Sequence, residues 1–91
     1  MKLYPSSVTA SNNPYGSFYQ HFKAVDDADA ANPMGDALSA VWSFSAGTTG
    51  LSMSGEADNR PLVMGADVQA GTATITATRG TDTASATITI K

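Results

Sequence analysis

The chain has 91 residues, the size of one domain, and its formal net charge at neutral pH is −3. Charged residues make up only 14% of it, and threonine, alanine and glycine are abundant, so the composition disfavours a helical bundle. The absence of cysteine excludes disulfide bonds and thiolate metal sites, and the five basic residues are too scattered to indicate a nucleic-acid partner.

The beginning of the chain is expected to form an extended first strand over residues 1–10 or an N-terminal arm over residues 1–11. Pro5 marks it as an edge strand or a break, because proline cannot donate a hydrogen bond to a strand ladder. This segment lacks the apolar core of a secretory signal, and no stretch of the chain could span a membrane. We therefore expect no signal peptide, synthesis in a cytoplasm and no membrane partner.

Residues 17–25 predict a second strand, which is rich in aromatic side chains. Its apolar residues divide between the two faces, with Phe18, Phe22 and Ala24 on one and Tyr19 and Val25 on the other. The pattern therefore predicts that one aromatic side chain is exposed or that a β-bulge interrupts the strand.

Residues 26–36 predict a long acidic connection. Clustered carboxylates attract Ca²⁺, so this segment contains the weak metal candidates of the chain, Asp26, Asp27, Asp29 and Asp36. The third ligand, the glycine and the closing glutamate of a Ca²⁺ loop are missing, which favours a solvated acidic loop. We expect no bound metal and no cofactor.

Residues 37–45 predict the central strand of the fold. Leu38, Ala40, Trp42 and Phe44 alternate with small polar residues and Val41, so they share one face. This pattern places the indole of Trp42 in the core, not at a ligand site. Two short strands are predicted next, at residues 51–55 and 61–65.

The last part of the chain, residues 71–90, alternates threonine or serine with alanine or isoleucine and predicts a β-hairpin. The apolar set is odd-numbered on the first strand and even-numbered on the second, so the loop must contain an even number of residues. Gly80-Thr81 satisfies this as a type II′ turn. In that register, Arg79 faces Asp82, Ile75 pairs with Ala86 and Ala73 pairs with Ile88.

Seven short strands separated by turn signals are typical of an all-β sandwich. Two blocks also resemble a bacterial immunoglobulin-like (Big) domain, closest to the group 2 type: Val41-Trp42-Ser43, and the GTATITA run within residues 70–78 followed by residues 84–90. The resemblance implies a seven-stranded immunoglobulin-like β-sandwich over residues 16–91. It also implies a structural role, since such domains resemble spacers and adhesion modules of bacterial surfaces and accessory domains of phage tails and capsids.

Candidate catalytic groups are few. His21 is the only histidine, and no serine lies in a strand-turn-helix elbow, so we expect no enzyme activity and assign no catalytic residue. Tyr4, Tyr15 and Tyr19 are the candidates for partner contact, because tyrosine is enriched at protein interfaces.

The resulting hypothesis is a non-enzymatic structural protein located in a phage virion. It would decorate the capsid or tail, with the major capsid protein, a tail protein or other copies of itself as partners. Two alternatives stay open: a carbohydrate- or receptor-binding adhesion module that binds a host-surface glycan, and an excised domain of a bacterial surface adhesin.

Overall fold

The computed structural model describes residues 1–11, 18–27, 37–55 and 59–91. These residues form β-strands and no α-helix, which confirms the all-β class. The strands are β1 (Lys2–Tyr4), β2 (Ser7–Ala10), β3 (Phe18–His21), β4 (Lys23–Val25), β5 (Val41–Ser45), β6 (Ser52–Ser54), β7 (Leu62–Gly65), β8 (Gly71–Arg79) and β9 (Asp82–Ile90).

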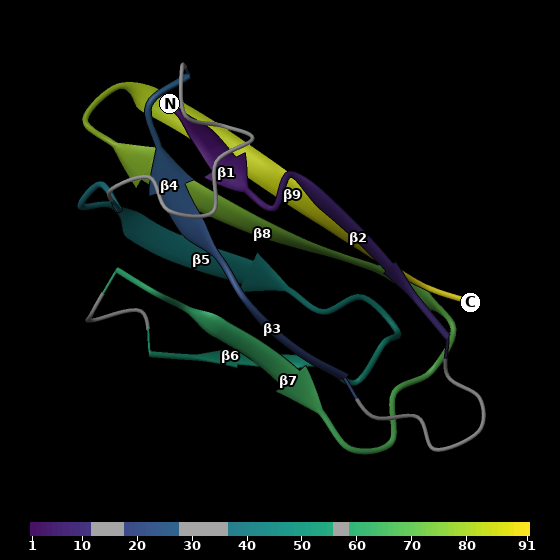
Figure 1. Cartoon of the computed structure of the whole chain (residues 1–91). Helices are drawn as coiled ribbons and strands as arrows, with labels where there is room; N and C mark the ends of the chain where they lie inside the picture. The colour runs from purple at the N-terminus through teal and green to yellow at the C-terminus, as the bar shows by residue number, and fades with distance from the viewer. Residues whose placement is uncertain (12–17, 28–36, 56–58) are drawn as a thin grey trace.

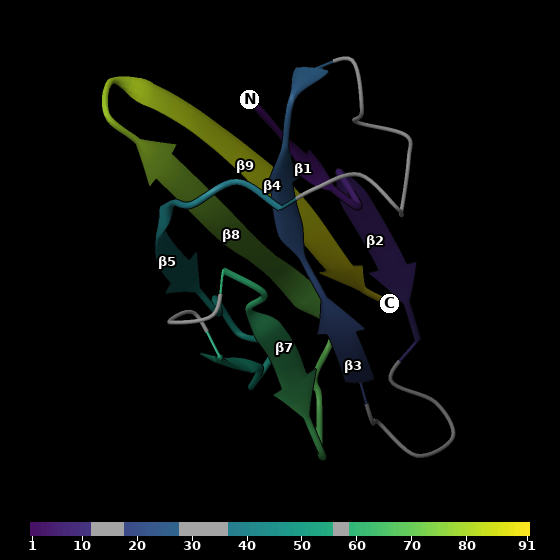
Figure 2. The same cartoon turned by 60° about the vertical axis from the view of Figure 1, so that its left-hand side comes forward.

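The strands form three sets of hydrogen-bonded neighbours (Figure 1). A four-stranded sheet has the order β2-β9-β8-β5, a three-stranded sheet has the order β3-β7-β6, and β1 pairs with β4. Only Phe22 separates β3 from β4, so one length of chain links the last two sets (Figure 2). Side chains from all three sets meet in one hydrophobic core.

The closing hairpin is confirmed in its register and in its turn. Arg79 lies opposite Asp82, and the large Ile75 meets the small Ala86 on the buried face. Gly80 has a φ of 64°, whereas Thr81 has no positive φ, as a type II′ turn requires. Of the apolar residues of β8 and β9 that point inward, Ile75 and Ile88 are fully buried and Ala84, near the turn, is partly buried.

Two predicted single strands are each divided in the structure. Pro5 separates β1, which pairs antiparallel with β4, from β2, which pairs parallel with β9. The chain breaks again at Phe22, whose backbone N–H donates to the carbonyl of Pro61 over 2.9 Å. The predicted exposed aromatic is Tyr19, which keeps 66% of its surface accessible, while Phe18 and Phe22 are buried.

The predicted central strand over residues 37–45 is wrong in position and length. The alternation is confirmed, since Trp42 is only 8% exposed and Val41 is 75% exposed. However, β5 starts at Val41 and lies at the edge of the four-stranded sheet, as far as the described strands show. Val41 pairs with Thr78, and only Arg79 follows Thr78 in β8, so most of residues 37–40 have no β8 residue to pair with.

Candidate functional site

The two outward sheet faces differ in chemistry. Outward residues of the four-stranded sheet are mostly serine and threonine, because they alternate with the buried apolar residues. One row of hydroxyls crosses all four strands in register: Ser45, Thr74, Thr87 and Ser7. This surface offers little to anchor a partner, because it has no aromatic side chain and its one large exposed apolar residue in the described strands is Val41, at the edge.

The outward face of β3 and β7 is aromatic and apolar. Tyr19 lies directly opposite Met64, and His21 lies opposite Leu62. Paired residues share a face of a sheet, so these four side chains, here named the tyrosine face, lie together. The rings of Tyr19 and His21 are in a T-shaped arrangement, with centroids 5.6 Å apart and planes at 89°. Tyr19 and Met64 are 66% and 42% exposed, and because they lie opposite each other they form one exposed patch.

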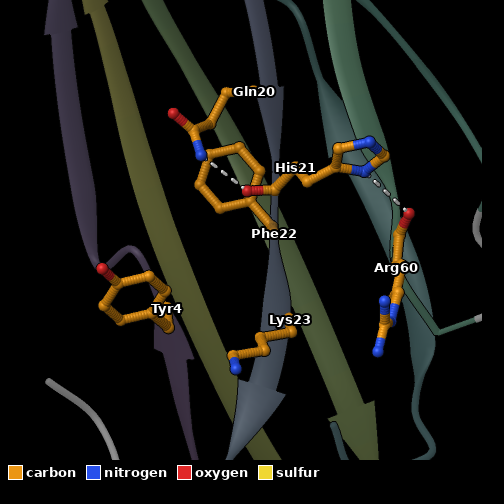
Figure 3. A pocket seen from close by; sticks show the side chains of 6 residues that line it. All are labelled: Tyr4, Gln20, His21, Phe22, Lys23 and Arg60. Carbon is orange, nitrogen blue, oxygen red and sulfur yellow. Dashed lines mark hydrogen bonds between the residues drawn. The ribbon is translucent and has the colours of Figure 1, made fainter. Parts of the chain in front are cut away.

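A hollow of about 340 Å³ adjoins the tyrosine face at His21. Its lining side chains are drawn in Figure 3: Tyr4, Gln20, His21, Phe22, Lys23 and Arg60. The hollow forms where β1 ends, because the chain turns away at Pro5 and continues as β2 on the other sheet. Of the strands that the structure describes, β3 therefore has β7 as its only neighbour.

Hydrogen bonds and a cation–π contact hold several side chains of the hollow in place. Tyr4 lies opposite Lys23, and the Lys23 ammonium is 5.8 Å from the centre of the Tyr4 ring. The side-chain amide of Gln20 donates to the carbonyl of His21 over 2.8 Å. On the other side, Nδ1 of His21 lies 3.4 Å from the carbonyl of Arg60, toward which Figure 3 shows the ring directed.

The electrostatic character of the hollow is basic. Lys23 and Arg60 are two of the five basic residues of the chain, and no carboxylate is among the described residues that line the hollow. A concave surface lined by charges of one sign concentrates the opposite charge. The arrangement can therefore hold an anionic group next to an aromatic ring and a side-chain amide donor.

The structure brings two of the predicted partner-contact residues to one surface. Tyr19 contacts His21, and His21 lines the same hollow as Tyr4. Tyr15 lies outside the described residues. Sequence reasoning missed Arg60, because it is far from Tyr4 and His21 in the chain and no periodic pattern connects them.

The acidic candidates for metal binding lie elsewhere. Asp27 is 2.9 Å from the α-amino group of Met1, and Asp82 is 3.1 Å from the same group. The hydrogen bond to Asp27, followed by that to Asp82, raises the pKa of the amino group, and the Met1 amino group lowers the pKa of Asp27.

The other acidic candidates form no metal site in the described residues. Asp26 is exposed, and Asp29 and Asp36 lie outside the described residues. No group of three or more potential metal ligands occurs within residues 1–11, 18–27, 37–55 and 59–91.

Comparison of the sequence with family models and curated proteins provides no relative from which a function could be transferred. No family model matches the chain. No curated protein sequence matches it at a significant level either. In the described part of the chain, no helix is long and apolar enough to cross a membrane.

Proposed function

We propose that the chain is a seven-stranded immunoglobulin-like β-sandwich. Counting β1 with β2 and β3 with β4 as the two halves of single strands leaves seven strands. The first, second, fourth and fifth then form one layer, and the third, sixth and seventh form the other. This division is the one found in constant-type immunoglobulin domains. The second half of the first strand lies beside β9 in the opposite layer.

We further propose that this module is a non-enzymatic structural protein of a phage virion, which decorates the capsid or the tail. The single observation that supports it is the strand pairing, since the division into layers agrees with the family that the Val41-Trp42-Ser43 block and the closing hairpin resemble. Binding to the assembled particle, but not to free subunits, stabilises the particle by mass action. Many copies on one lattice make weak individual contacts effective.

Mass spectrometry of purified particles of the phage that encodes the chain tests this function. We expect the chain as a structural component, present in many copies per particle. Particles that lack it should disassemble at a lower temperature than particles to which the purified chain has been added back. Absence of the chain from purified particles would contradict the proposal.

A carbohydrate-binding module is the second candidate, and one observation favours it. The hollow presents the Tyr4 ring together with the Gln20 side-chain amide, groups that suit a sugar ring and its hydroxyls. Binding on a glycan array that is lost on Tyr4→Ala would support this alternative.

A further inference from the structure

We infer that the tyrosine face and the adjoining hollow form one docking surface for a virion protein that presents an acidic side chain. The carboxylate of the partner enters the hollow beside Arg60, while Tyr19 and Met64 supply the apolar contact. This inference rests on the proposed virion function and adds the chemistry of the partner.

The apolar part of the surface has the composition of a protein interface. Tyrosine, methionine and arginine are enriched at interfaces, and clustered residues of this kind contribute most of the binding energy. Tyr19 and Met64 lie opposite each other, so their exposed surface is continuous. The outward face of the four-stranded sheet presents rows of hydroxyls instead, so the two faces of the molecule are not equivalent.

The charge of the surface defines the partner. Arg60 is exposed at the hollow, and its guanidinium makes no ion pair with a carboxylate in the described part of the chain. A guanidinium binds a carboxylate through two parallel N–H donors, which gives both strength and orientation. The chain as a whole carries a net charge of −3, so this basic surface is the part best suited to an acidic partner.

A protein fits the surface better than a glycan does, because of where the apolar residues lie. A sugar in the hollow would contact Tyr4 and Gln20 but would leave the exposed Tyr19 and Met64 outside it, since neither residue lines the hollow. A protein loop is large enough to cover both regions and to bury the apolar pair.

Cosedimentation with purified particles that lack the chain tests this surface. Arg60→Gln removes the guanidinium, and Tyr19→Ser removes the aromatic contact. We expect each to weaken binding about tenfold, because side chains at the centre of an interface contribute most of its binding energy. Raising NaCl to about 0.5 M should weaken binding of the unsubstituted chain, because salt screens the charge pair.

Matched controls come from the other sheet. Arg79→Gln removes the same charge from an exposed arginine, whose guanidinium donates to the carbonyl of Ser39. Val41→Ser removes an exposed apolar side chain from the edge strand β5. Both should bind within about twofold of the unsubstituted chain, since neither lies on the tyrosine face. Urea unfolding of all four variants verifies that they are folded.

A titration of the hollow with small molecules provides a second measurement. N-acetyl-glutamate should shift the NMR signals of residues that line the hollow, and N-acetyl-glutamine, which lacks the side-chain carboxylate, should shift them less. Arg60→Gln should abolish this difference, whereas Arg79→Gln should preserve it.

The outcomes separate the docking surface from the proposed function. If the unsubstituted chain does not bind particles, both the virion function and its partner are wrong. If it binds, but Arg60→Gln and Tyr19→Ser bind equally well, the docking surface is wrong and the virion function stands. If glucuronate shifts the NMR signals of the hollow at lower concentration than N-acetyl-glutamate does, and Tyr19→Ser has no effect on particle binding, the site binds a glycan. The inference of a protein partner is then wrong.

Discussion

The α-amino group of Met1 lies 2.9 Å from the carboxylate of Asp27 and so connects the start of β1 to the chain just after β4. The Met1 side chain is buried, whereas the carboxylate is 68% exposed, so water and salt screen this ion pair. Asp82, at the beginning of β9, binds the same amino group over 3.1 Å. The two ion pairs of the Met1 amino group therefore join the start of β1 to the chain just after β4 and to the start of β9.

This ion pair predicts a dependence of stability on pH at both ends of the range. The pKa of Asp27 is lowered in the folded chain. Its contribution to stability is therefore present above pH 3.8 and is lost as the pH falls through the pKa of the folded chain. The pKa of the Met1 amino group is raised in the folded chain. Its contribution to stability is therefore present below pH 8.0 and is lost as the pH rises through the pKa of the folded chain.

Urea unfolding at a series of pH values measures both effects. Asp27→Asn should flatten the acidic side of the profile, and acetylation of the amino group should flatten the alkaline side. Asp26→Asn is the matched control, since Asp26 is exposed and has no ion pair among the described residues. Equal profiles for Asp27→Asn and Asp26→Asn would contradict the assignment.

Trp42 should tolerate phenylalanine far better than alanine. The indole is buried, and its Nε1–H has no hydrogen-bond partner in the described structure, so its removal breaks no hydrogen bond. We expect Trp42→Phe to reduce the free energy of unfolding by less than about 1.5 kcal/mol. Trp42→Ala should cost about 3–5 kcal/mol, because it leaves a cavity. Far-UV circular dichroism during urea unfolding measures both losses of stability, and equal losses for the two variants would contradict the prediction.

Phe22, where the chain passes from β3 to β4, should be far more sensitive than its neighbour Tyr19. Phe22 is 1% exposed and Tyr19 is 66% exposed. Phe22→Ala should therefore lower stability by about 3–5 kcal/mol, whereas Tyr19→Ala should change it by about 0.5 kcal/mol or less. Thermal unfolding of the two variants compares them directly. A large loss for Tyr19→Ala would mean that its ring stabilises the fold and would weaken its assignment to docking.

Two glycines with similar backbone angles should respond differently to alanine. Gly47 and Gly80 have φ angles of 58° and 64°, so alanine at either position costs about 1 kcal/mol of backbone strain. A Cβ at Gly47 would also collide with the carbonyl oxygen of Thr72, whereas a Cβ at Gly80 would meet no atom within 4 Å. We expect Gly47→Ala to lose a further amount of about 1–3 kcal/mol in urea unfolding. Equal losses at the two positions would contradict the close approach at Gly47.

The local features of the fold follow from the amino-acid pattern alone. The alternation in residues 71–90 sets which side chains are buried, and the parity of the two runs sets the register and the turn at Gly80-Thr81. The alternation of apolar and polar residues also assigns Trp42 to the core, because a period of two is a property of each strand alone.

Which strands are neighbours, and which side chains meet, depends on contacts between distant parts of the chain. Division of the chain at Pro5 and Phe22 depends on pairing with β9 and β7, and no local pattern encodes partners so distant in the sequence. The same crossings open the hollow and place Arg60 beside His21. Strand alternation determines the face on which a side chain lies, but contacts between distant strands determine what lies next to it.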